Sequence, residues 1–253
     1  MYNTSFLFRA LALAILAGSL SLPAAARDVP AIKRKLSLPP SANLTYAIRA
    51  SLSGLTVSGD AKQQWRAADG KYTLTTETSA MLVGKILTAK SEGGVDEYGL
   101  APASFTEKRF RKDPATATFD RQAREISFSE SSETYPLRGG EQDRSSVIWQ
   151  LISIARASRE KFKPGSEWTF FVAGQYDAEP WVFKVGKTES IGTPLGDLDA
   201  VHIAKVQARD AKGQQLDIWL APSHEWYPAR LRITEESGDM IEQSLVSIGK
   251  LAP

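Results

Sequence analysis

Hydrophobic and polar residues alternate along most of the chain, which is the pattern of β-strands with one buried face. The alternation begins near residue 43, where Leu44, Tyr46 and Ile48 would share the buried face. It continues over 55–78 as a meander, in which Asp69-Gly70 is a hairpin turn signal. The first half of the chain is therefore expected to form consecutive antiparallel strands.

Three other segments of the first half carry specific expectations. The apolar run 80–87 would be a strand buried on both faces or one with a bulge at Gly84, and a helix remains open as an alternative. Gly93-Gly94 would close this strand, and 131–136 would be a loop. Six or seven strands precede any crossover helix, so the sheet must be antiparallel.

One segment, 143–158, has helical periodicity. Asp143 would be its N-cap, because its carboxylate can accept hydrogen bonds from free backbone N–H groups at the helix start. Pro164-Gly165 would stop the chain after the helix. The residues of its apolar face are Val147, Ile148, Leu151, Ile152 and Ala155. We expect this helix to pack against or into the sheet.

The second half returns to alternation, and its most structured stretch is 216–233. Two alternating runs there flank a turn at 222–224, which predicts a β-hairpin with an aromatic base. The strands predicted in this half are 167–173, 180–185, 200–208, 214–221, 226–234 and 241–248, with turns at 186–187, 192–196, 210–213 and 237–239. The fold class predicted is mainly β, a curved antiparallel meander or half-open β-barrel with one principal α-helix packed against or into it.

The amino terminus has the pattern of a secretory signal peptide over residues 1–26. Its apolar run is about 13 residues, shorter than the roughly 20 that cross a bilayer, although a membrane anchor is the alternative. Cleavage after Ala26 would release a periplasmic product with no stable membrane span. We expect a flexible leader over 27–42 and a single β-rich domain over 43–253.

Composition narrows the compartment and the partners. The chain contains no Cys, which excludes disulfides and a lipid-modified signal peptide and fits a bacterial periplasm better than an animal extracellular space. Its net charge is +2, too small to predict electrostatic capture of nucleic acid or of anionic lipid.

Residues that could carry chemistry are few. His202 would be an ordinary strand residue, and His224 would be a turn residue next to Glu225. Ser145 and Ser146 lack a G-x-S-x-G elbow and are interpreted as first-turn helix residues. Carboxylate pairs adjacent along a strand face opposite ways. No catalytic residue, metal site or cofactor is therefore predicted.

Aromatic residues are the remaining candidates for a binding role. Most of the six Trp should fill the core, and a minority could line a cavity for an apolar, lipid-like or sugar-like ligand. The candidate ligand-binding residues are Trp149, Trp219, His224, Trp226 and Tyr227.

Five short motifs occur in a characteristic order along the chain. They are Gly99-Leu100-Ala101-Pro102 with Phe105, Ala117-Thr118-Phe119-Asp120, Gln142-Asp143, Thr193-Pro194-Leu195-Gly196 ahead of Ala200-Val201-His202, and Trp219-Leu220-Ala221-Pro222 leading to Pro228-Ala229-Arg230. This ordered set resembles the bacterial domain-of-unknown-function family 3108. The resemblance implies an exported envelope protein of Gram-negative bacteria. It also implies a curved sheet similar in style to periplasmic lipoprotein carriers, and it supplies no catalytic or binding residues.

Three functions follow as hypotheses. The first is a periplasmic, non-enzymatic binding or envelope-maintenance protein, whose half-barrel cavity holds an apolar or lipid-like ligand and is plugged or gated by the helix 143–158. The second is a structural or interaction module that docks an envelope protein. The third is a hydrolase using His202 or His224, which requires a carboxylate or Ser within hydrogen-bond reach of the ring in a cleft.

Overall fold

The computed structural model describes residues 29–81, 83–206 and 214–250, so the predicted signal peptide and the predicted turn at 210–213 lie outside the described residues. The described strands form one sheet of 15 strands in the order β8-β7-β6-β5-β4-β3-β2-β1-β15-β14-β13-β12-β11-β10-β9. Their bounds are β1 Ala42–Leu52, β2 Leu55–Ala68, β3 Lys71–Ala80, β4 Gly84–Asp96, β5 Gly99–Arg109, β6 Ala115–Asp120, β7 Glu125–Phe128, β8 Ser131–Pro136, β9 Gln142–Asp143, β10 Glu167–Ala173, β11 Ala178–Thr193, β12 Gly196–Val206, β13 Gln215–Leu220, β14 Pro228–Thr234 and β15 Met240–Lys250.

The chain enters this sheet at its centre. From β1, consecutive antiparallel strands lead outward to β8 at one edge. The chain then passes to β9 and the helix α2 (Ser146–Ala157), and β10 to β15 lead back until β15 pairs with β1. The two-residue pairing of β9 with β10 is parallel, and the other pairings of the described strands are antiparallel. The predicted antiparallel fold is confirmed.

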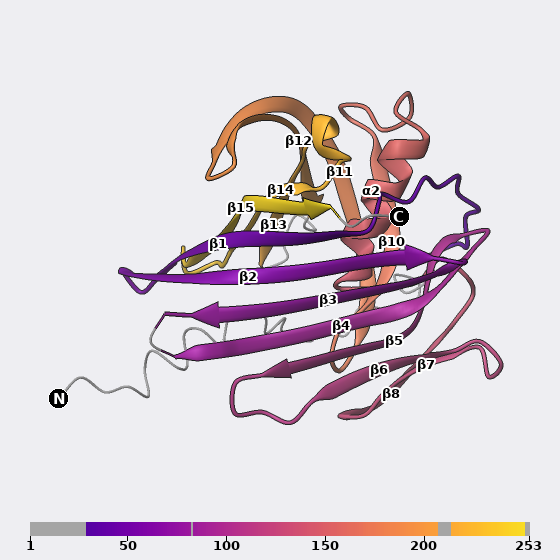
Figure 1. Cartoon of the computed structure of the whole chain (residues 1–253). Helices are drawn as coiled ribbons and strands as arrows, with labels where there is room; N and C mark the ends of the chain where they lie inside the picture. Colours follow the sequence, from indigo (N-terminus) through magenta and orange to yellow (C-terminus); the bar gives the residue numbers. More distant parts are fainter. Residues whose placement is uncertain (1–28, 82, 207–213, 251–253) are drawn as a thin grey trace.

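The sheet is strongly curved but stays open. Figure 1 shows β1 to β5 on one side and the later strands behind them, with α2 against the concave face. The two ends of the sheet also face each other, since Phe171 of β10 lies 5.5 Å from Tyr135 of β8 between ring centroids. Both rings belong to a hydrophobic cluster shared by β4 to β8, β10 and β11. The half-open barrel with a helix packed into it is confirmed.

The first correction concerns the apolar run 80–87. Strand β3 ends at Ala80 and β4 begins at Gly84, whose φ is +81°, so the run contains a turn. The bulge lies at the following residues, because Thr78 pairs with Leu87 whereas Ser79 pairs with Lys85. The Asp69-Gly70 turn is confirmed, with φ of +51° and +69° at its two residues.

Two glycine-containing pairs, Gly93-Gly94 and Gly186-Lys187, were expected to end strands but lie inside them. Strand β4 continues through Gly93-Gly94, and a Cβ on Gly93 would lie 2.2 Å from the carbonyl oxygen of Ala101. Strand β11 continues through Gly186-Lys187 with a register shift. Glycine inside a long strand marks a bulge or a close backbone approach, and this is the physical reason for both errors. The segment 131–136, expected to be a loop, is the edge strand β8.

The helix boundary also differs from the expectation. Helix α2 begins at Ser146, and Asp143 belongs to β9. The capping role of Asp143 is nevertheless present, because its Oδ1 accepts hydrogen bonds from the backbone N–H groups of Ser145 and Ser146, each at 2.8 Å. The helix is buried on more than its apolar face, since Gln150 and Ser153 are also buried. Tertiary packing therefore encloses α2 more completely than its sequence pattern indicates.

The segment 29–41 contains no strand or helix but is hydrogen-bonded to the body of the protein. The N–H of Ser37 donates to the carbonyl of Ser153 in α2 at 3.0 Å. The carbonyl of Pro39 accepts from Trp65 Nε1 at 3.0 Å, and that of Pro40 accepts from Tyr227 Oη at 2.7 Å. This segment thus connects the start of β1 to the helix and to the aromatic core.

Candidate functional site

The concave face can be described as rows that cross the strands, because antiparallel register places one residue of each strand side by side. Three rows matter here, each read from β1 to β5. The helix row is Ala42, Trp65, Leu74, Ser91 and Phe105; the middle row is Leu44, Gln63, Thr76, Ala89 and Glu107; the outer row is Tyr46, Ala61, Thr78, Leu87 and Arg109. The rows lie progressively further from α2 along the strands.

Aromatic stacking holds α2 against the helix row. The ring of Trp149 lies 4.2 Å from that of Trp65 between centroids, with an interplanar angle of 15°. Tyr227 contacts the other side of this core, with its ring centroid 6.0 Å from that of Trp149. Trp65 and Trp149 are almost fully buried, so the stack fills this end of the concave face.

A buried carboxylate lies where α2 meets the helix row. Asp143 Oδ2 accepts a hydrogen bond from Ser91 Oγ at 2.5 Å, and Ser91 Oγ is 3.0 Å from Tyr72 Oη. Burial raises the pKa of Asp143 to about 6, against the lowering effect of the hydrogen bonds from Ser91, Ser145 and Ser146. Burial also raises the pKa of Tyr72, with a further increase from the Asp143 charge. This network fixes the helix start to β3 and β4.

Two glutamines fix the helix start to β5. Gln150 Oε1 accepts from the N–H of Leu100 at 2.8 Å, and its Nε2 donates to the carbonyl of Tyr98 at 3.0 Å. Gln142 Nε2 donates to the carbonyl of Leu100 at 2.7 Å, while its Oε1 is buried and has no partner among the described residues. Gly99, with φ +130°, is required here because a Cβ would lie 2.0 Å from the Gln150 amide nitrogen.

The middle and outer rows differ from the helix row in carrying unpaired polar atoms. Tyr46 Oη, Gln63 Oε1 and Thr78 Oγ1 are buried and lack a hydrogen-bond partner among the described residues. Tyr46 and Thr78 are only 1% and 7% exposed, and they flank the small Ala61 on adjacent strands. We call Tyr46, Gln63 and Thr78 the polar band. Buried polar groups normally have partners, so the polar band is a part of this face with unused hydrogen-bonding capacity.

Apolar side chains surround the polar band on the side away from the helix. They are half-buried and come from both halves of the sheet: Ile48, Val57, Leu87, Ile233 and Ile241. The pairings Ala50–Ile241 and Ile241–Ile233 place the β14 and β15 members on the same face as Ile48. Figure 1 shows that β1 to β4 extend well beyond α2, so the helix covers only one end of these strands.

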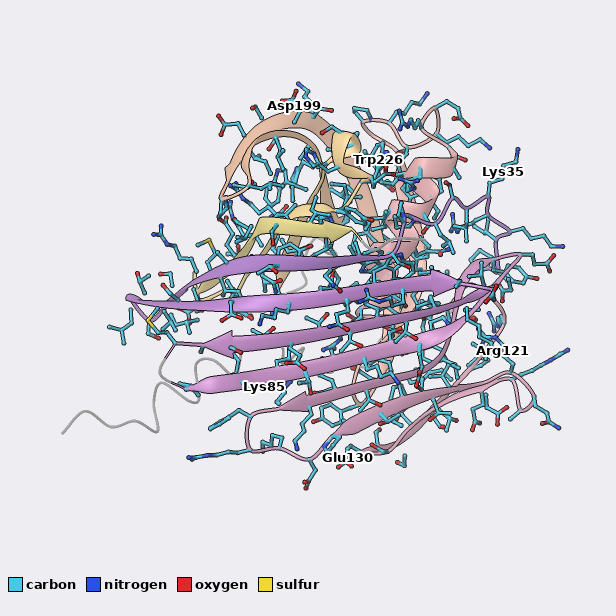
Figure 2. The ribbon with its side chains drawn as sticks, viewed as in Figure 1. Lys35, Lys85, Arg121, Glu130, Asp199 and Trp226 are labelled. Atoms are coloured by element: carbon cyan, nitrogen blue, oxygen red, sulfur yellow. The ribbon has the colours of Figure 1, made fainter. Side chains whose placement is uncertain are left out.

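The predicted ligand-binding residues fall into different places. Trp149 and Tyr227 are brought together in the helix-end core, and Trp226 joins them through Phe162, whose ring it meets edge-on at 5.8 Å. Figure 2 places Trp226 beside the top of α2. His224 lies in the hairpin turn with its Nδ1 2.9 Å from the hydroxyl of the neighbouring Ser223. Trp219 belongs to a separate hydrophobic cluster on the opposite face.

That second cluster lies beneath the long β11–β12 hairpin, which arches over the later strands (Figure 1; Asp199 is labelled on the arch in Figure 2). Trp219 Nε1 donates to Glu189 Oε2 at 3.0 Å, and the His202 ring stacks on the indole at 4.8 Å. His202 Nε2 is 2.7 Å from Asp217 Oδ1, and this hydrogen bond raises the pKa of His202. The contacts attach the arch to β13.

Each histidine therefore has only one of the two partners that a hydrolase would need: one histidine has a carboxylate, and the other has a hydroxyl. His202 has the carboxylate of Asp217, whereas His224 has the hydroxyl of Ser223. Within the described ranges, no recorded hydrogen bond joins these pairs into a Ser–His–carboxylate chain, and no group of three His, Asp or Glu residues could hold a metal ion.

The residues of the polar band were not among the predicted candidates. The alternation of hydrophobic and polar residues placed Tyr46 on the buried face, and a buried tyrosine hydroxyl is a signal by which the sequence could have identified this residue. Gln63 and Thr78 carry no such signal, because the absence of a partner depends on what the adjacent strands bring to the same face.

Comparison with solved structures agrees with the fold. The structure is similar to a β-barrel-like protein of the DUF1849 family from Brucella abortus, at a TM-score of 0.55 and 12% identity, covering 87% of this chain and 100% of that one. A putative exported protein with a YmcC-like fold from Bacteroides fragilis matches at a TM-score of 0.38 and 8% identity, over 87% of this chain and 100% of that one, which is too distant to carry an argument.

None of the helices in the described ranges is both long and apolar enough to cross a membrane.

Sequence comparison assigns the family. No curated protein matches the chain. The sequence model of the family "Protein of unknown function (DUF3108)" matches residues 43–246, and the chain therefore belongs to the DUF3108 family.

Proposed function

We propose that this protein is an exported, non-enzymatic binding protein of the bacterial periplasm that holds a lipid-like ligand on the concave face beside α2. The observation that carries the proposal is the polar band, where Tyr46 Oη, Gln63 Oε1 and Thr78 Oγ1 are buried in a largely apolar wall and have no partner in the part of the chain that the structure describes. Ligand sites are typically concave and apolar with a few polar groups that fix orientation.

The helix supports this proposal by dividing the concave face. The stack of Trp65 on Trp149 and the hydrogen bonds of Asp143 occupy one end of the face. Gln63, Thr78, Ile48 and Val57 lie further along the strands, and Tyr46 joins them to the hydrophobic core that contains Trp65 and Trp149. A ligand would therefore lie against β1 to β4 beyond α2, with the helix as the closed end of its site.

The compartment in this proposal comes from the amino-terminal sequence and the composition. Residues 1–26 have a signal-peptide pattern, and a chain without Cys can fold in an oxidising compartment with no risk of wrong disulfides. The amino-terminal mass of protein recovered from a periplasmic fraction tests this part, because cleavage after Ala26 predicts a chain that begins at Arg27.

Native mass spectrometry of the full-length gene product, recovered from the periplasm of a Gram-negative host, tests the ligand. We expect a bound species of lipid mass that organic extraction removes. The variant Val57→Arg should lose it, because Val57 lies on the concave face, whereas Ser58→Arg, one residue along β2 on the opposite face, should retain it. A ligand-free wild type that also fails to bind a fluorescent, uncharged acyl-chain probe would overturn the proposal.

A second candidate function rests on the edge strand β8. Its side chains at 132–134 are exposed, and its outer edge pairs with no other described strand. An open edge can add a strand from a partner protein, so β8 favours an interaction module of the envelope. In the same mass spectra, a stoichiometric protein partner in place of a lipid would favour this function.

A further inference from the structure

We infer that the site beside α2 selects a lipid whose polar head is uncharged and both donates and accepts hydrogen bonds, such as the hydroxyl groups of a monoacylglycerol. The inference rests on the proposed function and specifies the class of ligand. It follows from the hydrogen-bonding capacity and the charge of the polar band.

The hydrogen-bonding capacity of the band is mixed. The hydroxyls of Tyr46 and Thr78 can each donate or accept. Gln63 has an unpaired acceptor, because its Oε1 has no partner among the described residues, while one of the two N–H groups of its Nε2 donates to Thr76 Oγ1 at 3.2 Å. A ligand that satisfies the band must therefore present a donor to Gln63 and an acceptor to a hydroxyl. A carboxylate or phosphodiester has no donor and would leave Gln63 unpaired.

The charge of the surrounding rows points the same way. Arg109 and Glu107 end the outer and middle rows and form an ion pair, with Nε 2.7 Å from Oε1 and side chains only 12% and 5% exposed. These are the only charged side chains in the three rows as described from β1 to β5. Burying an anionic or cationic head next to this neutral pair would leave its charge uncompensated.

The position of the apolar residues sets the orientation. Ile48 and Val57 lie further from α2 than the polar band, and Ile233 and Ile241 approach the same region from the other half of the sheet. The head of the ligand would therefore lie nearer to the Trp65–Trp149 stack, and the acyl chain would extend along β1 and β2 away from the helix.

Competition binding tests the selectivity. Delipidated mature protein is loaded with a fluorescent apolar probe at pH 8 and titrated, below their micelle concentrations, with monooleoylglycerol, oleate and oleoyl-lysophosphatidylglycerol, which share one acyl chain. We expect monooleoylglycerol to compete about tenfold more tightly than either anion. Equal or tighter competition by an anion would overturn the head-group inference while leaving the proposed function intact. Failure of all three lipids and of the probe to bind would overturn both.

Variants test whether the band makes the selection. Thr78→Val should weaken monooleoylglycerol about fivefold and methyl oleate less, because the ester can accept a hydrogen bond from Thr78 but has no hydroxyl that donates one. Gln63→Leu should act in the same way. Thr75→Val is the matched control, since Thr75 lies on β3 but faces the other side of the sheet. An equal weakening of both lipids in a folded Thr78→Val protein, or an equal weakening of monooleoylglycerol in Thr75→Val, would contradict the assignment.

Discussion

The two ends of the concave face are built from the same strands but pair their polar atoms differently. At the helix end, Asp143 accepts three hydrogen bonds, Gln150 makes two, and Trp65 Nε1 reaches the carbonyl of Pro39. In the polar band, the buried hydroxyls of Tyr46 and Thr78 have no partner within the described ranges. The bonded side chains of the helix end hold the helix in place, with Gln142 Oε1 and Trp226 Nε1 as the unpaired exceptions among the described residues, whereas all three side chains of the polar band keep an unpaired atom.

Removing the aromatic stack should have the largest effect on the helix end. Trp149→Ala should lower the free energy of unfolding by about 3–5 kcal/mol, because it leaves a large cavity against Trp65. Urea denaturation followed by circular dichroism measures the free energy of unfolding. The control is Tyr176→Ala, because Tyr176 is 47% exposed, and its free energy of unfolding should stay within about 0.5 kcal/mol of the wild-type value. Unchanged stability with lost lipid binding would mean that Trp149 lines the ligand site.

Gly99→Ala tests how tightly Gln150 holds β5. The new Cβ would lie 2.0 Å from the Gln150 amide nitrogen at a φ of +130°, so we expect a loss of about 2–4 kcal/mol from strain and from the two broken hydrogen bonds. Gly54→Ala is the control, because its Cβ would meet no atom within 4 Å and only its φ of +80° opposes the change. An equal loss in both variants would show that strain alone explains the result.

Asp143→Asn tests the buried charge through pH. The folded-state pKa of Asp143, about 6, exceeds its ordinary value of 3.8, so protonation favours the folded state. The stability that this group contributes is present below about pH 4 and is lost as the pH rises through about 6, by about 2–3 kcal/mol in total. The difference in unfolding free energy between wild type and variant, measured from pH 4 to pH 7.5, should therefore change by that amount. A flat difference would contradict a raised pKa.

The smallest change is expected in the polar band. Thr78→Val removes a buried hydroxyl that has no partner, so the ligand-free protein should keep its stability or gain up to about 1 kcal/mol. Thr76→Val, two residues away on the same face, removes the acceptor of the Gln63 amide and should lose about 0.5–1.5 kcal/mol. Thermal unfolding of delipidated protein measures the change in stability of each variant relative to wild type. A loss of stability in both variants would show that the Thr78 hydroxyl is paired.

The sequence predicts most strands because each needs only local alternation. The expected strand 167–173 coincides with β10. The expected turn at Asp69-Gly70 is also present, and both of its residues have the positive φ angles that this type of turn requires. The errors occur where distant residues decide the outcome. Asp143 is drawn into β9 by its pairing with Ala173, which delays the helix to Ser146.

The site was less predictable than the fold for the same reason. Trp149 and Tyr227 could be identified as large aromatic residues, and the structure brings them together. Gln63 and Thr78 look like ordinary strand residues in the sequence. Their importance depends on Ala61 and Tyr46, which reach the same face through the register of three strands, and register is set by the whole sheet.

The pairing of β1 with β15 also determines the order in which the protein can fold. The hairpins from β1 to β8 and from β10 to β15 join neighbours in the chain, so their loops close at little entropic cost. The β1–β15 ladder joins Ala42 to Lys250, and it can form only after almost the whole domain is available. Such a distant contact slows folding and leaves two sheet edges open in the meantime. A chaperone that covers the edge of β1 should therefore raise the yield of the exported protein more than one that covers α2.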